Sequence, residues 1–173
     1  MAVKPIVELG NPLLRQVSES VADPTSPETA ALVADLADTL ADFRRRTGYG
    51  RGIAAPQIGV LKRVVVVQMP GEQPVALINP LIEWASEDKF TVWDACFSYF
   101  VLFFQVERAK RVRVRYKDQG GRQQVIEAAD DLAELLQHEI DHLDGQLAID
   151  LVEDPRSFCT VEEYERRHAR HPG

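Results

Sequence analysis

The segment from Gln137 to His142, which reads Gln-His-Glu-Ile-Asp-His, constrains the fold of this chain more than any other feature. Two histidines four residues apart share one face of a helix, so His138 and His142 can bind one metal ion if this segment is helical. Glu139 then stands beside the metal, where a carboxylate can accept a proton from water. The segment therefore predicts a metal-binding helix and a hydrolytic site.

A hydrolytic metal site generally has three protein ligands and one open position. The longer zinc-protease pattern H-E-x-x-H-x-x-G-x-x-H is matched as far as Gly145, but Ala148 stands where the third histidine would be. The third ligand must therefore come from another part of the chain. Cys96 is the better candidate, and the alternative is a downstream glutamate such as Glu153, Glu162 or Glu163.

Hydrophobic periodicity predicts an α+β fold in a single domain that spans residues 1–173, with no repeat or linker to divide it. Residues 26–46 have apolar side chains at helical spacing and begin with Ser-Pro-Glu, which predicts a helix. The metal-binding helix is expected over residues 130–142, and a terminal helix over residues 161–170. Mostly antiparallel sheets around the metal-binding helix are predicted from runs at residues 63–69, 75–78, 111–116 and 123–128.

Charge and composition narrow the classes of partner. The chain has 27 acidic and 20 basic residues, and its net charge of -7 argues against nucleic acid as a partner. No apolar run is long enough to span a bilayer, so a cytoplasmic protein without membrane contact is expected, as a monomer or weak homodimer. Without a secretion signal, Cys96 and Cys159 are expected to be free thiols.

Three segments, in order and spacing, resemble the three motifs of the peptide deformylase family. They are Gly50 to Gln57, Asp94 to Ser98, and Gln137 to His142. The segments Glu8 to Arg15 and Val112 to Tyr116 also resemble parts of that family, so the resemblance covers nearly the whole chain.

The resemblance implies a site for one divalent metal ion with Cys96 as a thiolate ligand beside His138 and His142. A soft thiolate and two imidazoles suit Zn or Fe in a tetrahedral site with one open position. The resemblance favours Fe(II), with Zn(II), Ni(II) or Co(II) as substitutes. It also implies that Glu139 is the catalytic base.

Further residues receive roles from the same resemblance. The Gln57 side chain and the Phe97 backbone N–H would donate to the developing oxyanion, and one such donor is typically worth about 10²- to 10³-fold in rate. Gly50 and Gly52 would let the backbone approach the substrate closely. The implied reaction removes the N-formyl group from a formylated peptide or a small formyl amide, which releases formate and a free amine.

The chain departs from the family pattern around the expected substrate pocket. Asp131 and Glu134 lie seven and four residues before His138, on the face of the metal ligands, where the family has apolar residues that help to accept a methionine side chain. Arg51 stands between the two glycines, where the family has an apolar residue. These charges predict a more polar pocket with altered specificity. The residues expected to contact the substrate there are Arg51, Arg108, Asp131 and Glu134. Alternatively, Arg51 or Arg108 pairs with Glu134 and neutralises it.

The run Tyr99 to Phe104 also differs from the family, and its six apolar residues predict a pocket wall, an association surface or a core strand. Three rival functions stay open. The chain could be a small-molecule amide hydrolase of the same fold, a metalloprotease with a downstream glutamate ligand, or a non-catalytic metal-site protein that binds a partner through this run.

Overall fold

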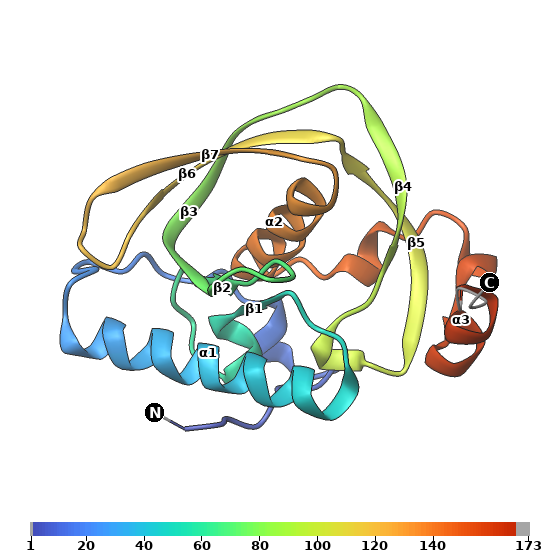
Figure 1. Ribbon diagram of the computed structural model, residues 1–173, viewed down its shortest axis with the longest axis horizontal. Helices are drawn as coiled ribbons and strands as arrows, with labels where there is room; N and C mark the ends of the chain where they lie inside the picture. The colour runs from blue at the N-terminus through green and yellow to red at the C-terminus, as the bar shows by residue number, and fades with distance from the viewer. Residues whose placement is uncertain (1, 169–173) are drawn as a thin grey trace.

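The computed structural model describes residues 2–168 and confirms the predicted α+β architecture (Figure 1). The helices are α1 (Pro27–Thr47), α2 (Asp130–Leu143) and α3 (Val161–His168). The strands are β1 (Gly52–Ala54), β2 (Val64–Val67), β3 (Val75–Ala85), β4 (Lys89–Asp94), β5 (Leu102–Ala109), β6 (Arg111–Lys117), β7 (Gln123–Ala129) and β8 (Cys159–Thr160). The last two positions of the predicted terminal helix, 169 and 170, lie outside the described residues.

The strands form two antiparallel sheets, as the alternating runs predict. The larger sheet has the order β1-β2-β3-β6-β7, and the smaller one has the order β4-β5-β8. In β6, Val112 and Val114 are buried while Arg111 and Arg113 are exposed, because successive side chains of a strand point to opposite faces. At β6 the larger sheet therefore has one face in the core and one in solvent, whereas all four residues of β2 are buried.

Helix α1 has clear signals at both ends. The Ser26 hydroxyl accepts a hydrogen bond from the backbone N–H of Thr29 at 3.1 Å, and Pro27 occupies the first turn. Gly48 ends the helix with a φ of 78°, which glycine adopts at little cost. Leu36 and Leu40 face inward and pack with valines of β2.

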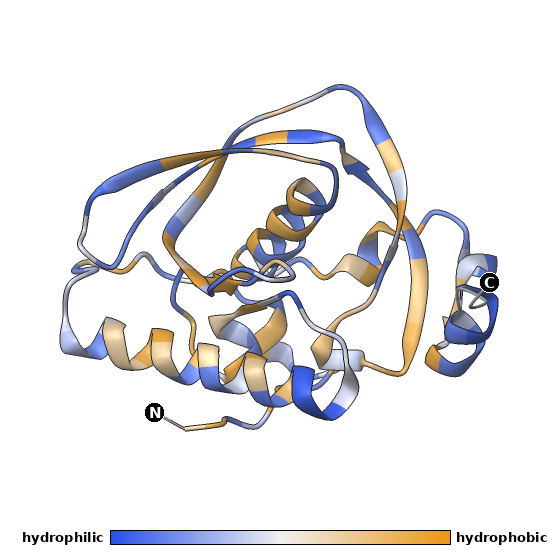
Figure 2. Cartoon of the chain, viewed as in Figure 1, coloured by the Kyte–Doolittle hydropathy of each residue, from blue (hydrophilic) through white to orange (hydrophobic). Residues whose placement is uncertain are grey.

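Helix α2 occupies the middle of the molecule and contacts strands of both sheets (Figure 1). Apolar and polar residues alternate around it (Figure 2), and Ala133, Leu136, Ile140 and Leu143 join the core beneath the larger sheet. The His138, Glu139 and His142 side chains of the metal-binding motif are buried as well. Because buried charged groups are costly without partners, their burial in a central helix points to a function.

The sequence prediction misses β1, β4 and β8, and it gives β5 only in part, as the core-strand alternative for the run Tyr99 to Phe104. β1 and β8 are only three and two residues long. β8 also pairs with a strand that is distant in the sequence, as in the pairing of Leu102 with Thr160. None of the helices within residues 2–168 combines the length and the apolar character that crossing a membrane requires.

Candidate metal centre

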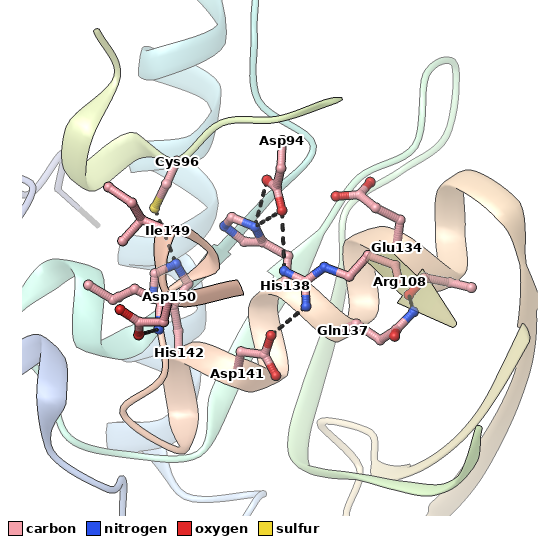
Figure 3. A network of polar contacts seen from close by, with 12 residues as sticks. Asp94, Cys96, Arg108, Glu134, Gln137, His138, Asp141, His142, Ile149 and Asp150 are labelled. Atoms are coloured by element: carbon pink, nitrogen blue, oxygen red, sulfur yellow. Dashed lines mark hydrogen bonds and ion pairs between the residues drawn. The ribbon is translucent and has the colours of Figure 1, made fainter. Parts of the chain in front are cut away.

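The three predicted ligands meet at one point. Cys96 follows β4, and His138 and His142 lie one turn apart on α2, so their ligand atoms all fall within 4.8 Å of one another. Cys96 Sγ lies 3.3 Å from His142 Nε2 (Figure 3). All three side chains are buried. A thiolate and two imidazoles that converge in this way fit a divalent ion such as Fe or Zn.

The alternative ligands are placed elsewhere. Among the described residues, the groups that could hold a metal ion are the triad and a second group formed by Asp94, Glu134 and His138. Neither group includes a downstream glutamate. Glu153 and Glu162 are exposed, and Glu163 pairs with arginines of its own helix.

Asp94 fixes the orientation of the His138 ring by a contact with its Nδ1 atom. Its carboxylate lies 2.9 Å from His138 Nδ1, which leaves Nε2 as the nitrogen for a metal. Burial alone would raise the pKa of Asp94, but His138 and Arg108 lower that pKa to about 2. Burial likewise disfavours the protonated form of His138, yet Asp94 more than offsets this and raises the pKa of His138. The sequence motif places Asp94 beside Cys96 but does not reveal this contact.

Arg108 does not contact the cavity, which corrects its predicted role in substrate binding. Its guanidinium donates to Asp94 at 3.2 Å and to Asp141 at 2.5 Å, and its side chain is only 3% exposed (Figure 3). Two carboxylates compensate for the burial of this cation. Arg108 therefore supports His138 through Asp94, and the predicted pairing of Arg108 with Glu134 is wrong.

Glu139 lies beside the triad as a buried carboxylate. Its Oε2 has no hydrogen-bond partner within the described part of the chain, and burial raises the pKa of Glu139 to about 7. A base with a pKa near neutrality is suited to proton transfer. Gly52 gives it room, because a Cβ atom there would lie 2.5 Å from Glu139 Oε1.

Gln57 and Phe97 lie beside Cys96. The Gln57 side chain is fully buried; its Oε1 accepts a hydrogen bond from the backbone N–H of Ala54 at 2.9 Å. Its Nε2 donates to Cys96 Sγ at 3.4 Å, and a primary amide has a second N–H to offer. Phe97 directly follows Cys96, which brings its backbone near the same point.

A cavity of about 100 Å³ opens onto these groups. One wall is polar and the other is aromatic. Gly50 has a φ of 115°, and a Cβ atom there would lie 2.6 Å from the Phe97 ring, so glycine is needed for the close approach of these two segments. The aromatic wall consists of Tyr49, Trp93, Phe97, Phe100 and Phe103.

The polar wall contains an ion pair between the loop before β1 and α2. Arg51 Nη2 lies 2.5 Å from Glu134 Oε2, with the Glu134 side chain 5% exposed and the Arg51 side chain 37% exposed. The predicted pairing of Arg51 with Glu134 is confirmed. Asp131 is exposed and does not line the cavity, which corrects its predicted place in the pocket. It lies in the first turn of α2, after Asp130.

The run Tyr99 to Phe104 divides between two roles. Tyr99 and Phe104 are buried in a core cluster with Cys96, while Phe100 and Phe103 line the cavity. Val101 is the one member that is largely exposed, at 66%. The predictions of a pocket wall and of a core strand are each correct in part, and that of an association surface stays a prediction.

Comparisons with known proteins agree with this geometry. Residues 3–157 match the family model described as polypeptide deformylase. The peptide deformylase of Bartonella tribocorum is 36% identical, over 96% of this chain and 94% of the relative. The crystal structure of a peptide deformylase from Ehrlichia chaffeensis in complex with actinonin superposes with a TM-score of 0.81, at 29% identity over 98% of this chain and 100% of that one.

A class I type b peptide deformylase from Acinetobacter baumannii, crystallised with Met-Ala-Ser bound, superposes with a TM-score of 0.80. It is 28% identical, with 87% of this chain and 99% of that chain covered. The fold, the convergent ligand triad and these similarities lead to one conclusion. The chain belongs to the peptide deformylase family.

Proposed function

We propose that this chain is a metal-dependent hydrolase that removes the N-formyl group from a peptide or amine, within a pocket more polar than a methionine side chain requires. The observation that carries the proposal is the convergence of Cys96, His138 and His142 beside the unpartnered carboxylate of Glu139. The buried N and S donors fit a divalent ion, with Fe(II) favoured and Zn(II), Ni(II) or Co(II) as substitutes. When bound, such an ion polarises a carbonyl group and acidifies water.

The residues of the chain supply the proton transfers. Glu139 accepts a proton from the water that attacks the formyl carbon, and then delivers this proton to the nitrogen of the leaving amine as the C–N bond breaks. The products are formate and a free amine. The second N–H of Gln57 and the backbone N–H of Phe97 donate to the oxygen that becomes negatively charged.

The supporting residues hold these groups in place. Asp94 keeps the His138 ring oriented, and Arg108 keeps Asp94 ionised. Gly52 leaves space for Glu139 against the backbone. Most of these groups are buried, which excludes competing water and strengthens their electrostatic effect.

The purified protein tests the proposal directly. We expect formyl-Met-Ala-Ser to yield formate and free amine in equal amounts, because hydrolysis of one amide releases one of each. Chelation should abolish the release, and added Fe(II) should restore it. A metal-loaded chain that releases no formate from any formyl amide would favour the rival of a non-catalytic metal-site protein.

The ion pair of Arg51 and Glu134 supports an altered substrate preference. An apolar side chain placed against these charged groups would strip them of water without replacing the lost hydrogen bonds. Arg51 already neutralises Glu134, so a basic side chain gains little there. The Arg51 side chain is partly exposed and its guanidinium has further N–H donors, which instead favours a substrate side chain that accepts hydrogen bonds.

Replacing both members of this pair tests the preference. In Arg51→Leu/Glu134→Leu, we expect the ratio of kcat/KM for formyl-Met-Ala-Ser over formyl-Gln-Ala-Ser to rise about tenfold or more, since one group in a pocket contributes about that much discrimination. The double change leaves neither charge buried alone. The matched control is Arg115→Ala/Glu83→Ala, which removes an ion pair on the larger sheet, away from the cavity residues. An unmodified protein that strongly prefers formyl-Met would contradict the altered preference.

The volume of the cavity favours a second candidate, a hydrolase of small formyl amides. About 100 Å³ is less than the roughly 300–1,000 Å³ typical of ligand pockets. A small substrate would fit such a cavity without movement of its walls. Higher kcat/KM for a formyl amino-acid amide than for the formylated tripeptide would support this candidate.

A further inference from the structure

Helix α3 lies beside β5 of the smaller sheet (Figure 1). Its Tyr164 side chain contacts the aromatic wall of the cavity. The Tyr164 ring stacks on the Phe103 ring, with centroids 3.9 Å apart and planes inclined by 4°. Tyr164 also meets Trp93 edge to face at 5.4 Å. Strand β8 precedes the helix directly and pairs with β5 at Phe103, so the backbone brings Tyr164 to this place.

A hydrogen bond also joins α3 to Tyr49, another residue of the aromatic wall. The Tyr49 hydroxyl donates to Glu165 Oε1 at 3.0 Å. Tyr49 belongs to the loop that leads into β1. Gly50 of the first motif follows it in this loop, and Gly52 is the first residue of β1. The Tyr49 ring lies 5.6 Å from that of Phe103. One helix therefore contacts cavity residues from three separate segments of the chain.

These ring contacts and this hydrogen bond hold α3 in place. None of its residues is buried, so it contributes little to the core. Its aromatic and hydrogen-bonded partners Tyr49, Trp93 and Phe103 all line the cavity. In the small cavity, a displacement of any of these three rings changes the space available to a ligand.

We propose that α3 is a specificity-determining element of the active site, with Tyr164 and Glu165 as positioning residues. They fix Tyr49, Trp93 and Phe103 as an apolar wall for the part of the substrate beyond the formyl group. The charged wall with Arg51 faces the same cavity, so the site selects N-formyl compounds that combine an apolar part with a hydrogen-bonding group. This inference rests on the proposed function only for the identity of the substrate.

Variants of the hydrogen bond between Tyr49 and Glu165 test the inference in the full chain. We expect Glu165→Ala and Tyr49→Phe each to raise the Kd for actinonin about threefold to tenfold, measured by titration calorimetry, because one hydrogen bond that orders the wall is lost. The KM for formyl-Met-Ala-Ser should rise in parallel, with kcat within about twofold. Glu165→Gln should bind actinonin with the Kd of the unmodified protein, since the glutamine amide oxygen still accepts a hydrogen bond from the Tyr49 hydroxyl.

The control is Glu163→Ala in the same helix. Glu163 pairs with Arg166 and Arg167 and does not line the cavity, so we expect its loss to weaken α3 without altering the wall. The Kd of the double variant Tyr49→Phe/Glu165→Ala for actinonin should be no higher than that of either single variant, because both substitutions remove the same contact.

The outcomes separate this inference from the proposed function. Unchanged Kd values in Glu165→Ala and Tyr49→Phe, or an equal rise in Glu163→Ala, would overturn the role of α3. Shifts in Kd as expected, in a protein that releases no formate, would support the role of α3 and contradict the proposed reaction. Absence of actinonin binding by the unmodified protein would contradict both.

Discussion

Glu139→Gln is expected to reduce formate release by at least about 10³-fold while the metal stays bound. The amide cannot take a proton from water, and general-base catalysis contributes roughly 10²- to 10⁴-fold. The side chain keeps nearly the same shape in a tightly packed place, beside Gly52, so the ligands should not move. Stability should not fall either, because Glu139 Oε2 is a buried oxygen without a partner.

Three measurements on this variant separate chemistry from folding: formate release, metal content by elemental analysis, and the melting temperature. Glu127→Gln is the matched control, because Glu127 is an exposed carboxylate on β7 that pairs with Arg113. It should behave as the unmodified protein. Retention of more than about a tenth of the activity in Glu139→Gln would refute the role of Glu139 as the base.

Cys96→Ala is expected to lose both the metal and the activity. Two imidazoles remain, and a site with two protein ligands holds a divalent ion far more weakly than one with three. Metal content should fall from about one ion per chain to a small fraction, and formate release should fall in proportion. Cys96 is also packed in a core cluster, so part of the loss in melting temperature reflects the missing sulfur.

The second cysteine of the chain provides the control for this variant. Cys159 is buried in β8, and no metal-ligating group among the described residues contains it. Cys159→Ala should therefore keep its metal. If Cys96→Ala keeps its metal as well, the third ligand is a different residue, and a metalloprotease with a downstream glutamate becomes the better account.

The metal triad could be predicted because its geometry is mostly local. Two histidines four residues apart in a helix must share a face, and this gives two of the three ligands without any knowledge of the fold. Cys96 followed from the resemblance of an ordered set of motifs. The elements with strong periodicity, such as α1, β6 and α2, were predictable for the same local reason.

Contacts between distant segments could not be predicted in the same way. Helical periodicity placed Glu134 on the ligand face. Whether Arg51 or Arg108 neutralises it depends on tertiary packing, because these arginines lie 83 and 26 residues before Glu134 in the chain. Arg108 turned toward Asp94 and Asp141 because these two carboxylates lie behind the ligands. No local pattern reports which of two cations is nearer to an anion in the folded state.

The sequence also could not show which residues of the run Tyr99 to Phe104 form the aromatic wall. An apolar run such as Tyr99 to Phe104 is consistent with a strand, a pocket wall or an exposed surface. A short 3₁₀ turn at Phe97–Tyr99 and the start of β5 at Leu102 divide it, so Phe104 enters the core while Phe100 and Phe103 face the cavity. The contact with α3 adds a segment from the end of the described chain.

X-ray absorption at the metal edge of the zinc-loaded protein tests the central claim most directly, because it reports the ligands without reference to activity. With Cys96, His138 and His142 as ligands, the spectrum should contain one sulfur at about 2.3 Å and two imidazole nitrogens at about 2.0–2.1 Å. The sulfur contribution should disappear in Cys96→Ala. A spectrum of the unmodified protein with nitrogen and oxygen ligands but no sulfur would contradict the proposed metal centre.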